Sequence, residues 1–159
     1  MRITVIAVGK LKESFYRQAV CEYGKRLGRY CKLLIREVED EKTPDVSSRA
    51  QCEQILKKEG ERILRLLPED AYVVTLEIEG RRFTSEEFAD RIGRLGVDGT
   101  SHIVFVIGGS LGLHNIVKRR ASLAVSFSDM TFPHQLMRVI LLEQIYRAYR
   151  IINGEPYHK

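Results

Sequence analysis

Short runs of β-branched and aliphatic residues alternate with longer segments of helical periodicity along the whole chain. The runs typical of strands are residues 3–8, 31–38, 72–78, 102–107 and 123–127. The segments with helical spacing of apolar residues are 14–27, 48–67, 84–95, 115–121 and 134–152. This alternation is typical of an α/β fold in which helices cover both faces of a parallel sheet. Since 159 residues suit one compact domain, we predict a single domain over residues 1–159.

The last expected helix, 134–152, is apolar around most of its circumference, and Pro133 suits its first turn. A helix of this kind is buried on more than one side. This favours packing both on the sheet and on a second subunit, and therefore a homodimer. Helix 14–27 of the same subunit could cover that side instead. The helix contains four charged residues, Arg138, Glu143, Arg147 and Arg150. These charges argue against a membrane span.

The overall composition restricts the compartment and the partners. A formal net charge of +5 is compatible with a nucleic-acid partner but does not require one. Cys21, Cys31 and Cys52 show no C-x-x-C spacing, so we expect free thiols in a reducing environment. The apolar run at the N-terminus is too short for a secretory signal, and we predict a cytoplasmic protein. No two histidines have metal-ligand spacing, and we predict no metal site.

Three expected strand ends carry the residues most suited to binding a ligand, because ligands of open parallel sheets bind at the carboxyl ends of strands. They are Thr75-Leu-Glu-Ile-Glu-Gly80, Ile107-Gly-Gly-Ser-Leu-Gly112 and Ser126-Phe-Ser-Asp-Met-Thr-Phe132. Gly108 and Gly109 allow a sharp turn and a close approach of a ligand to the main chain, as for a flat nucleoside. A plain strand-to-helix turn would contain the same glycines.

Two other nucleotide-binding classes are disfavoured by motif spacing. The glycines read G-G-x-x-G and follow the fourth strand, whereas the dinucleotide fingerprint G-x-G-x-x-G belongs to the first strand–helix unit. Asp129 does lie about 20 residues on, where a ribose-binding acid would stand. The chain contains no Walker motif, which argues against ATP hydrolysis of the P-loop type.

The chain ends in Gly154-Glu-Pro-Tyr-His-Lys159, which places an aromatic ring, an imidazole and a cation together. A frayed terminus is the simpler interpretation. Against it, Pro156 stiffens the segment, which directly follows a buried helix.

Other charged residues have ordinary interpretations beside functional ones. Lys118-Arg119-Arg120 is either a phosphate contact or a solvated helix face. The acidic pairs Glu77/Glu79 and Glu86/Glu87 suit solvated or helix-capping groups better than acid–base partners. His102 is expected to be structural, and His134 could hold the loop before it by hydrogen bonding.

Five segments, taken together, resemble the SPOUT, or trefoil-knot, RNA methyltransferases. Within that family they are similar to the small bacterial enzymes that methylate N3 of a pseudouridine in 23S ribosomal RNA. The segments are Val5-Ile-Ala-Val-Gly-Lys10, Val104-Phe-Val-Ile-Gly-Gly-Ser-Leu-Gly112, Ser126-Phe-Ser-Asp-Met-Thr-Phe-Pro-His-Gln-Leu-Met-Arg138, Glu143-Gln-Ile-Tyr-Arg-Ala148 and Pro156-Tyr-His-Lys159. The resemblance covers essentially the whole chain.

The resemblance implies a homodimer that binds S-adenosylmethionine in a deep C-terminal trefoil knot and acts on the assembled ribosome. It implies a cofactor site lined by Leu76, Gly108, Phe127, Ser128, Asp129, Met130, Thr131 and Phe132. It also implies that Tyr157, His158 and Lys159 complete the site for the RNA.

Methylation at N3 requires that the imide of the base lose its proton. Negative charge then develops on the imide oxygens, and hydrogen-bond donors such as Arg138 and Lys159 would stabilise it. His158 could accept the proton or position the base. The alternative is a non-catalytic ribosome-binding factor on the same fold, which would need a basic face but no cofactor site.

Overall fold

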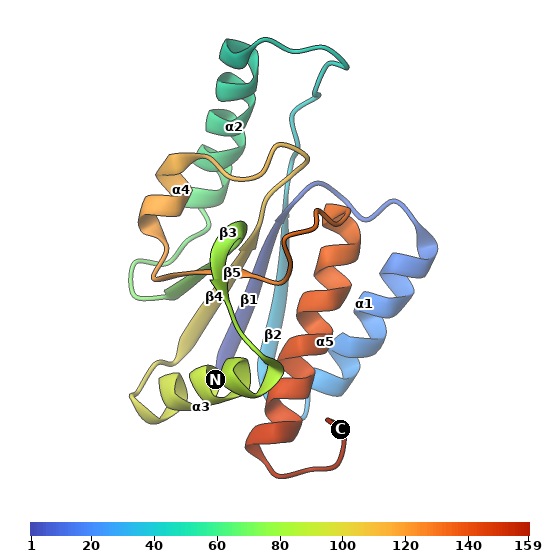
Figure 1. The fold of residues 1–159 in the computed structure, drawn as a ribbon, viewed down its shortest axis with the longest axis vertical. Coiled ribbons are helices and arrows are strands. Elements are labelled where there is room, and N and C mark those ends of the chain that lie inside the picture. The colour runs from blue at the N-terminus through green and yellow to red at the C-terminus, as the bar shows by residue number, and fades with distance from the viewer.

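Five parallel strands form one sheet in a computed structural model that describes all 159 residues. The strand order is β2-β1-β4-β3-β5, and every neighbouring pair is parallel (Figure 1). The strands are β1 (Arg2–Val8), β2 (Lys32–Val38), β3 (Tyr72–Arg82), β4 (His102–Ile107) and β5 (Leu123–Ser126). The predicted parallel α/β architecture is therefore confirmed.

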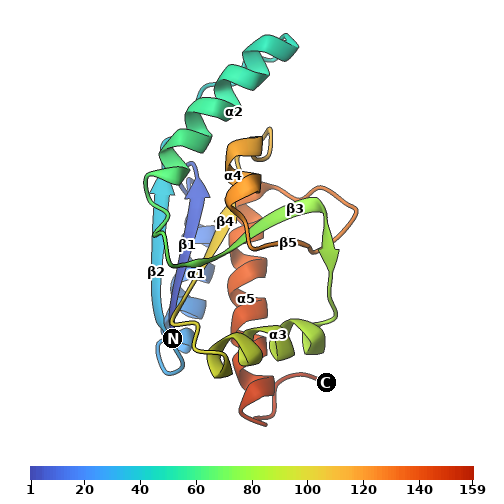
Figure 2. The same ribbon diagram turned by 90° about the vertical axis from the view of Figure 1, so that its left-hand side faces the viewer.

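Five helices cover the two faces of this sheet. They are α1 (Ser14–Leu27), α2 (Arg49–Leu64), α3 (Ser85–Val97), α4 (Asn115–Arg120) and α5 (His134–Ile152). Helices α1, α3 and α5 cover one face, while α2 and α4 cover the other (Figure 1). Figure 2 shows α2 projecting beyond the carboxyl ends of β1 and β2.

Alternate residues of each strand point to opposite faces and build two separate cores. In β1, Ile3 and Val5 face the larger core with α1, α3 and α5, whereas Ile6 and Val8 face the smaller one with α2 and α4. All six residues of the central strand β4 are buried, as expected for a strand covered on both faces.

Strand β3 is longer than the sequence pattern predicts, because it continues past Gly80 to Arg82 instead of ending at Ile78. Its pairing with β5 shifts register between Leu76 and Arg81 and then resumes, with Arg82 opposite Ser126. A Cβ at Gly80 would lie 2.7 Å from the carbonyl carbon of Val125, so a side chain has no room there. The partner that prolongs β3 is distant in sequence and leaves no local signal.

The helix starts follow the predicted capping chemistry. Thr84 caps α3 in a capping box with Glu87, and Ser48 caps α2 in the same way with Gln51. Glu87 is thus a capping group, as expected. Helix α2 ends at Leu64, earlier than residue 67, where we predicted its end.

Helix α5 packs on the sheet between α1 and α3. The covering by α1 that we considered as an alternative to a second subunit is therefore present within one chain. Several apolar side chains of α5 nevertheless remain half-exposed: Leu136, Met137, Val139, Ile140, Tyr146 and Ile151. No helix of the structure has the length and apolar character needed to cross a membrane.

Candidate functional site

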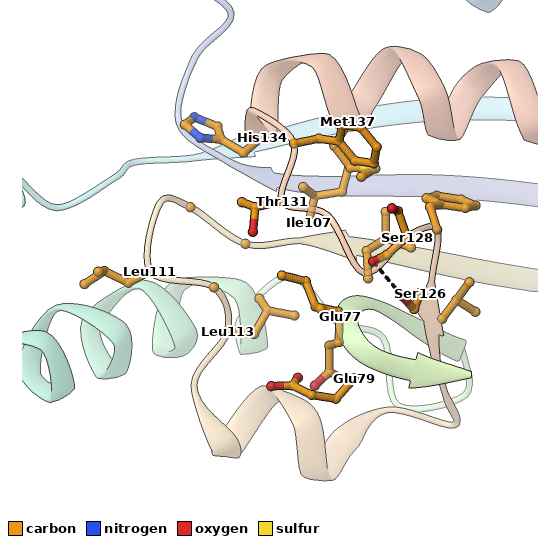
Figure 3. A pocket seen from close by; sticks show the side chains of 18 of the residues that line it. Glu77, Glu79, Ile107, Leu111, Leu113, Ser126, Ser128, Thr131, His134 and Met137 are labelled. Atoms are coloured by element: carbon orange, nitrogen blue, oxygen red, sulfur yellow. Dashed lines mark hydrogen bonds between the residues drawn. The ribbon is translucent and has the colours of Figure 1, made fainter. Parts of the chain in front are cut away.

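A pocket of about 340 Å³ lies where the carboxyl ends of β3, β4 and β5 meet the first turns of α5 (Figure 3). Seven of the eight residues that the family resemblance assigned to a cofactor line it: Leu76, Gly108, Phe127, Ser128, Met130, Thr131 and Phe132. Segments that are far apart in sequence thus form one site at the edge of the sheet where ligands of parallel sheets bind.

The glycine-rich turn after β4 forms one wall of the pocket, and its geometry explains its glycines. A Cβ on Gly108 would overlap the carbonyl group of Gly112, 2.6 Å from its carbon atom. Gly112 itself has a φ of 87°, in the left-handed region that favours glycine. The close approach that we expected from a ligand at Gly108 is therefore already made by the chain's own backbone.

Hydrogen bonds within residues 126–130 shape the opposite wall. The hydroxyl of Ser126 donates to the carbonyl oxygen of Ser128 at 3.1 Å, and the Ser128 hydroxyl accepts from the N–H of Met130 at 2.9 Å. The ring of Phe127 packs edge-on against Phe88 of α3, with centroids 6.2 Å apart.

Asp129 is the one predicted cofactor residue that does not line the pocket. Its carboxylate instead forms an ion pair with Arg82 at the end of β3. Both side chains are largely exposed, so the pair links the loop to β3 at the surface.

Three charged side chains of the pocket, Glu77, Glu79 and Lys118, were not among the residues assigned to the cofactor. Glu77, which lines the pocket (Figure 3), was expected to be a solvated or capping group. Its side chain is only 12% exposed, and its carboxylate lies 3.2 Å from the Lys118 ammonium. Successive residues of β3 can reach the pocket because the strand is irregular after Leu76. The sequence feature that could have identified Glu77 as a pocket residue is its position at the end of a predicted strand.

The basic run at residues 118–120 divides into three environments. Lys118 faces the pocket, Arg119 is exposed, and Arg120 donates to the carbonyl oxygens of Pro68 and Glu69. Only Arg119 fits the solvated helix face that was one interpretation of this run.

His134 also lines the pocket, beside the half-buried Met137. Burial lowers the pKa of His134 below its usual range, and the nearby Arg138 guanidinium acts in the same direction. The imidazole is therefore neutral at neutral pH, and it offers the pocket a hydrogen-bonding group without charge.

Arg138, predicted as a catalytic donor, lies outside the pocket and is 1% exposed. Its guanidinium donates to the carbonyl oxygens of Val8 and Gly9, at 3.3 and 2.6 Å, and to Glu37 at 2.7 Å. These bonds tie the first turns of α5 to the ends of β1 and β2. The N–H groups of Arg138 that were predicted to face a substrate thus form hydrogen bonds within the fold.

The C-terminal residues fold back along α5 instead of fraying. The Tyr157 hydroxyl donates to Glu143 at 3.1 Å, and its ring meets Tyr146 edge-on at 4.9 Å between centroids. Burial raises the pKa of Tyr157 to about 12, and the Glu143 carboxylate acts in the same direction. The phenol therefore stays protonated at neutral pH.

His158 bridges α5 and α3. Arg147 donates to its Nδ1 at 3.1 Å, and its Nε2 lies 2.8 Å from Glu86. Since an arginine can only donate, Nδ1 is the acceptor and Nε2 carries the proton shared with Glu86. Lys159 is exposed. None of these three terminal residues lines the pocket. Within one chain, the residues predicted to complete the RNA site therefore lie apart from those predicted to bind the cofactor.

A second cavity, of about 240 Å³, adjoins the pocket and is lined by residues of α3 and α5. It shares Val125, Ser126, Phe127 and Phe132 with the pocket, and Gln144 lies on its wall. Gln144 donates to Glu143 at 2.8 Å, the residue that accepts from Tyr157. A short polar chain on α5 therefore links this cavity to the C-terminal segment.

The remaining candidate groups have structural roles. His102 is hydrogen-bonded to Thr4 at 2.9 Å within the sheet, as expected of a structural histidine. The three cysteines are free thiols, and no group of three or more His, Cys, Asp or Glu side chains is arranged to hold a metal ion.

Comparisons with known proteins agree on one family. A family model described as a predicted SPOUT methyltransferase matches residues 1–158. A Bifidobacterium adolescentis protein named ribosomal RNA large subunit methyltransferase H is 61% identical over 159 residues, which cover 100% of both chains. Proteins of the same name from Clostridium kluyveri and Streptococcus suis are 55% and 54% identical over 100% of both chains.

A similarity to a solved structure concerns the fold alone. A probable methylase family protein from Haemophilus influenzae Rd KW20 aligns with a TM-score of 0.54 at 13% sequence identity. The alignment covers 99% of this chain and 70% of that one.

Proposed function

Because this chain belongs to the SPOUT methyltransferase family, we propose that it methylates N3 of a pseudouridine in 23S ribosomal RNA, with S-adenosylmethionine as the donor. We take residues 1–159 as one catalytic domain and the assembled cytoplasmic ribosome as its substrate. The observation that carries the proposal is the pocket of about 340 Å³ enclosed by residues 127–132 and the turn at Gly108. The names of the relatives support ribosomal RNA as the substrate class.

Membership of this family also implies a trefoil knot in the C-terminal part of the chain. At Gly80 the main chain passes close to a distant segment of this part, since a Cβ there would lie 2.7 Å from the carbonyl carbon of Val125. A close approach of this kind fits a chain whose segments are threaded past one another.

The pocket fits the proposed donor in its chemistry. S-adenosylmethionine supplies the methyl group from its sulfonium when it is bound. Apolar side chains, among them Leu76, Ile107 and Leu113, offer a surface for a flat base, while Glu77 and Lys118 provide charged groups on the β3 side. Exclusion of water by this apolar wall strengthens the polar contacts made inside the pocket.

We further propose that Tyr157, His158 and Lys159 serve the RNA, as a stacking ring, a proton acceptor or positioning group, and a cation. In the isolated chain, both ring nitrogens of His158 are engaged, by Arg147 and Glu86. The imidazole must therefore leave Arg147 before Nδ1 can accept a proton. Arg138 is not part of this proposal, because its guanidinium is committed to Glu37 and to main-chain carbonyls.

A homodimer is part of the proposal, with the half-exposed apolar side chains of α5 at the interface. A second subunit would cover these side chains and could bring its C-terminal residues to the pocket of the first. Light scattering at micromolar concentration tests this element. A stable monomer with full methylation activity would contradict it.

The decisive experiment is mass spectrometry of 23S ribosomal RNA from a strain that lacks the protein. We expect one pseudouridine to lack its methyl group, and purified protein with S-adenosylmethionine to restore it on assembled ribosomes but not on free RNA. Calorimetry with S-adenosylmethionine is the second measurement. Ribosome binding without any cofactor binding would instead favour a non-catalytic ribosome-binding factor.

A further inference from the structure

Glu77 is a charged side chain placed deep in the pocket, with 12% of its side chain exposed. By comparison, 36% of the Lys118 side chain is exposed, and Glu79 is an exposed residue. Burying a carboxylate is unfavourable unless its oxygens have partners. The partners of Glu77 therefore indicate what the group is prepared to bind.

Each oxygen of the Glu77 carboxylate has one partner from the chain. The Thr75 hydroxyl, which is fully buried, donates to Oε2 at 2.6 Å, and the Lys118 ammonium lies 3.2 Å from Oε1. Each carboxylate oxygen accepts about two hydrogen bonds. One acceptor position therefore remains on each oxygen, while Thr75 and Lys118 hold the group in place.

We propose, on the basis of the function proposed above, that Glu77 accepts hydrogen bonds from the 2′ and 3′ hydroxyls of the donor's ribose. A carboxylate only accepts hydrogen bonds, and the cis-diol of a ribose donates two of them side by side. Acidic residues recognise ribose in this way in dinucleotide-binding folds. Leu76, the neighbour of Glu77 on β3, contributes to the apolar wall that suits the adenine.

The ion pair with Lys118 favours a hydroxyl over a cation as the partner of Glu77. The ammonium already compensates the charge of the carboxylate, so its remaining capacity is for hydrogen bonds. The α-amino group of the donor is the competing partner, and the experiment below separates the two.

The test is calorimetric binding of S-adenosylhomocysteine and of its 2′-deoxy and 3′-deoxy analogues to the full-length protein. We expect the wild type to bind at least one deoxy analogue roughly 10- to 100-fold more weakly, as for loss of a hydrogen bond to a charged group. Glu77→Gln should bind the same deoxy analogue no more than roughly 3-fold more weakly than it binds S-adenosylhomocysteine. An equal loss of affinity for the deoxy analogue in the wild type and in Glu77→Gln would overturn the assignment.

Two controls make the result specific. Glu79→Gln makes the same chemical change at the other carboxylate that lines the pocket, and it should retain the full wild-type loss of affinity for the deoxy analogue. If Glu79→Gln removes that loss and Glu77→Gln does not, Glu79 holds the diol and the assignment to Glu77 is wrong. Binding of 5′-methylthioadenosine, which lacks the amino-acid portion, should weaken in Glu77→Gln as much as binding of S-adenosylhomocysteine does. If only S-adenosylhomocysteine binding weakens, Glu77 holds the amino group and the assignment is wrong.

The failure of this inference is distinguishable from failure of the proposed function. A wild type that binds none of these nucleosides would overturn the proposed cofactor and this inference together. Should Glu77→Gln unfold by circular dichroism, Thr75→Val removes one of the two groups that hold the carboxylate. That variant should show a deoxy-analogue loss smaller than the wild type's, and an unchanged loss would count against the assignment.

Discussion

The two ends of α5 carry the two predicted halves of the site, and the structure builds them differently. At its first turns, the pocket is enclosed by the main chain of three strand ends and by the glycine turn at residues 108–112. Beyond its last turn, the chain folds back to its C-terminus (Figure 1), and Tyr157 and His158 are attached through side chains of α5 and α3. The pocket is therefore part of the fold itself, whereas we expect the C-terminal segment to be able to detach without unfolding the protein.

The energies of the contacts support this distinction. A half-exposed ion pair contributes about 0–1 kcal/mol, and an aromatic pair such as Tyr146 with Tyr157 contributes about 0.5–1.5 kcal/mol. Contacts of this size hold a segment in place and still allow it to move to a substrate. The close main-chain contacts at Gly80 and Gly108 beside the pocket have no comparable freedom.

The largest effect should come from adding a methyl group to the glycine turn. We expect Gly108→Ala to abolish cofactor binding and to destabilise the protein by about 3 kcal/mol or more, because the Cβ would overlap the carbonyl group of Gly112. Urea denaturation and calorimetry measure the two effects.

Gly24→Ala is the matched control for this change, since a Cβ there meets only the Leu33 side chain at 3.9 Å. It should stabilise α1 by about 0.5–1 kcal/mol. Equal stabilities of the two variants would show that the turn can relax. The same steric conflict means that a bulkier residue at Gly108 cannot by itself identify a cofactor contact.

The next effect concerns the anchor of α5 at the pocket end. We expect Arg138→Met to destabilise the protein by about 2–4 kcal/mol, because Glu37 and two carbonyl oxygens lose their donor. Thermal unfolding measures this loss. Arg119→Met, at an exposed position, should change stability by less than about 0.5 kcal/mol. A fully stable Arg138→Met protein with slow methylation would restore Arg138 as a catalytic candidate.

Deleting residues 157–159 tests whether the C-terminal segment is needed for methylation but not for cofactor binding. We expect methylation of ribosomes to be lost, while binding of S-adenosylhomocysteine changes less than about 3-fold, a difference below 1 kcal/mol. The deletion should cost about 1–3 kcal/mol of stability, because Tyr157 and His158 lose their contacts with α5 and α3. Single-turnover methylation at the wild-type rate would return these residues to a passive role.

The smallest expected effect concerns the reactivity of two cysteine thiols, Cys21 and Cys31. Burial raises the pKa of the Cys31 thiol, which lies beside Tyr149 at the C-terminal end of α5, to about 11. In a Cys52→Ser background at pH 8, the exposed Cys21 should react with Ellman's reagent at least ~100-fold faster than Cys31. Deleting residues 157–159 should leave Cys31 protected, because the protein core covers it. Rapid labelling after the deletion would show that the segment stabilises this end of the fold.

The same thiol predicts a direction for the pH dependence of stability. Its folded pKa is raised, so the unfolded chain ionises first as the pH rises. The contribution of Cys31 to stability is thus complete below pH 9.0 and is lost as the pH rises through about 11. Cys31→Ser should flatten the fall in melting temperature over this range.

The sequence alone determined the elements, their order and the edge of the sheet where the pocket lies. Period-two and helical spacing are local properties, so the extents of α1, β4 and α5 could be predicted without the structure. The strand ends at residues 75–80, 107–112 and 126–132 were identifiable for the same reason. The roles of individual residues at those ends were less accessible.

Only the tertiary structure decided which side chains enter the pocket and which hold the fold together. Glu77 enters the pocket because β3 becomes irregular where β5 pairs with it, and Asp129 pairs with Arg82 outside the pocket. Arg138 was predicted to be a donor to the substrate, but its acceptors are groups at the ends of β1 and β2. Each of these outcomes depends on contacts between segments that are far apart in sequence. A local pattern specifies the face of an element but not the partner that it meets.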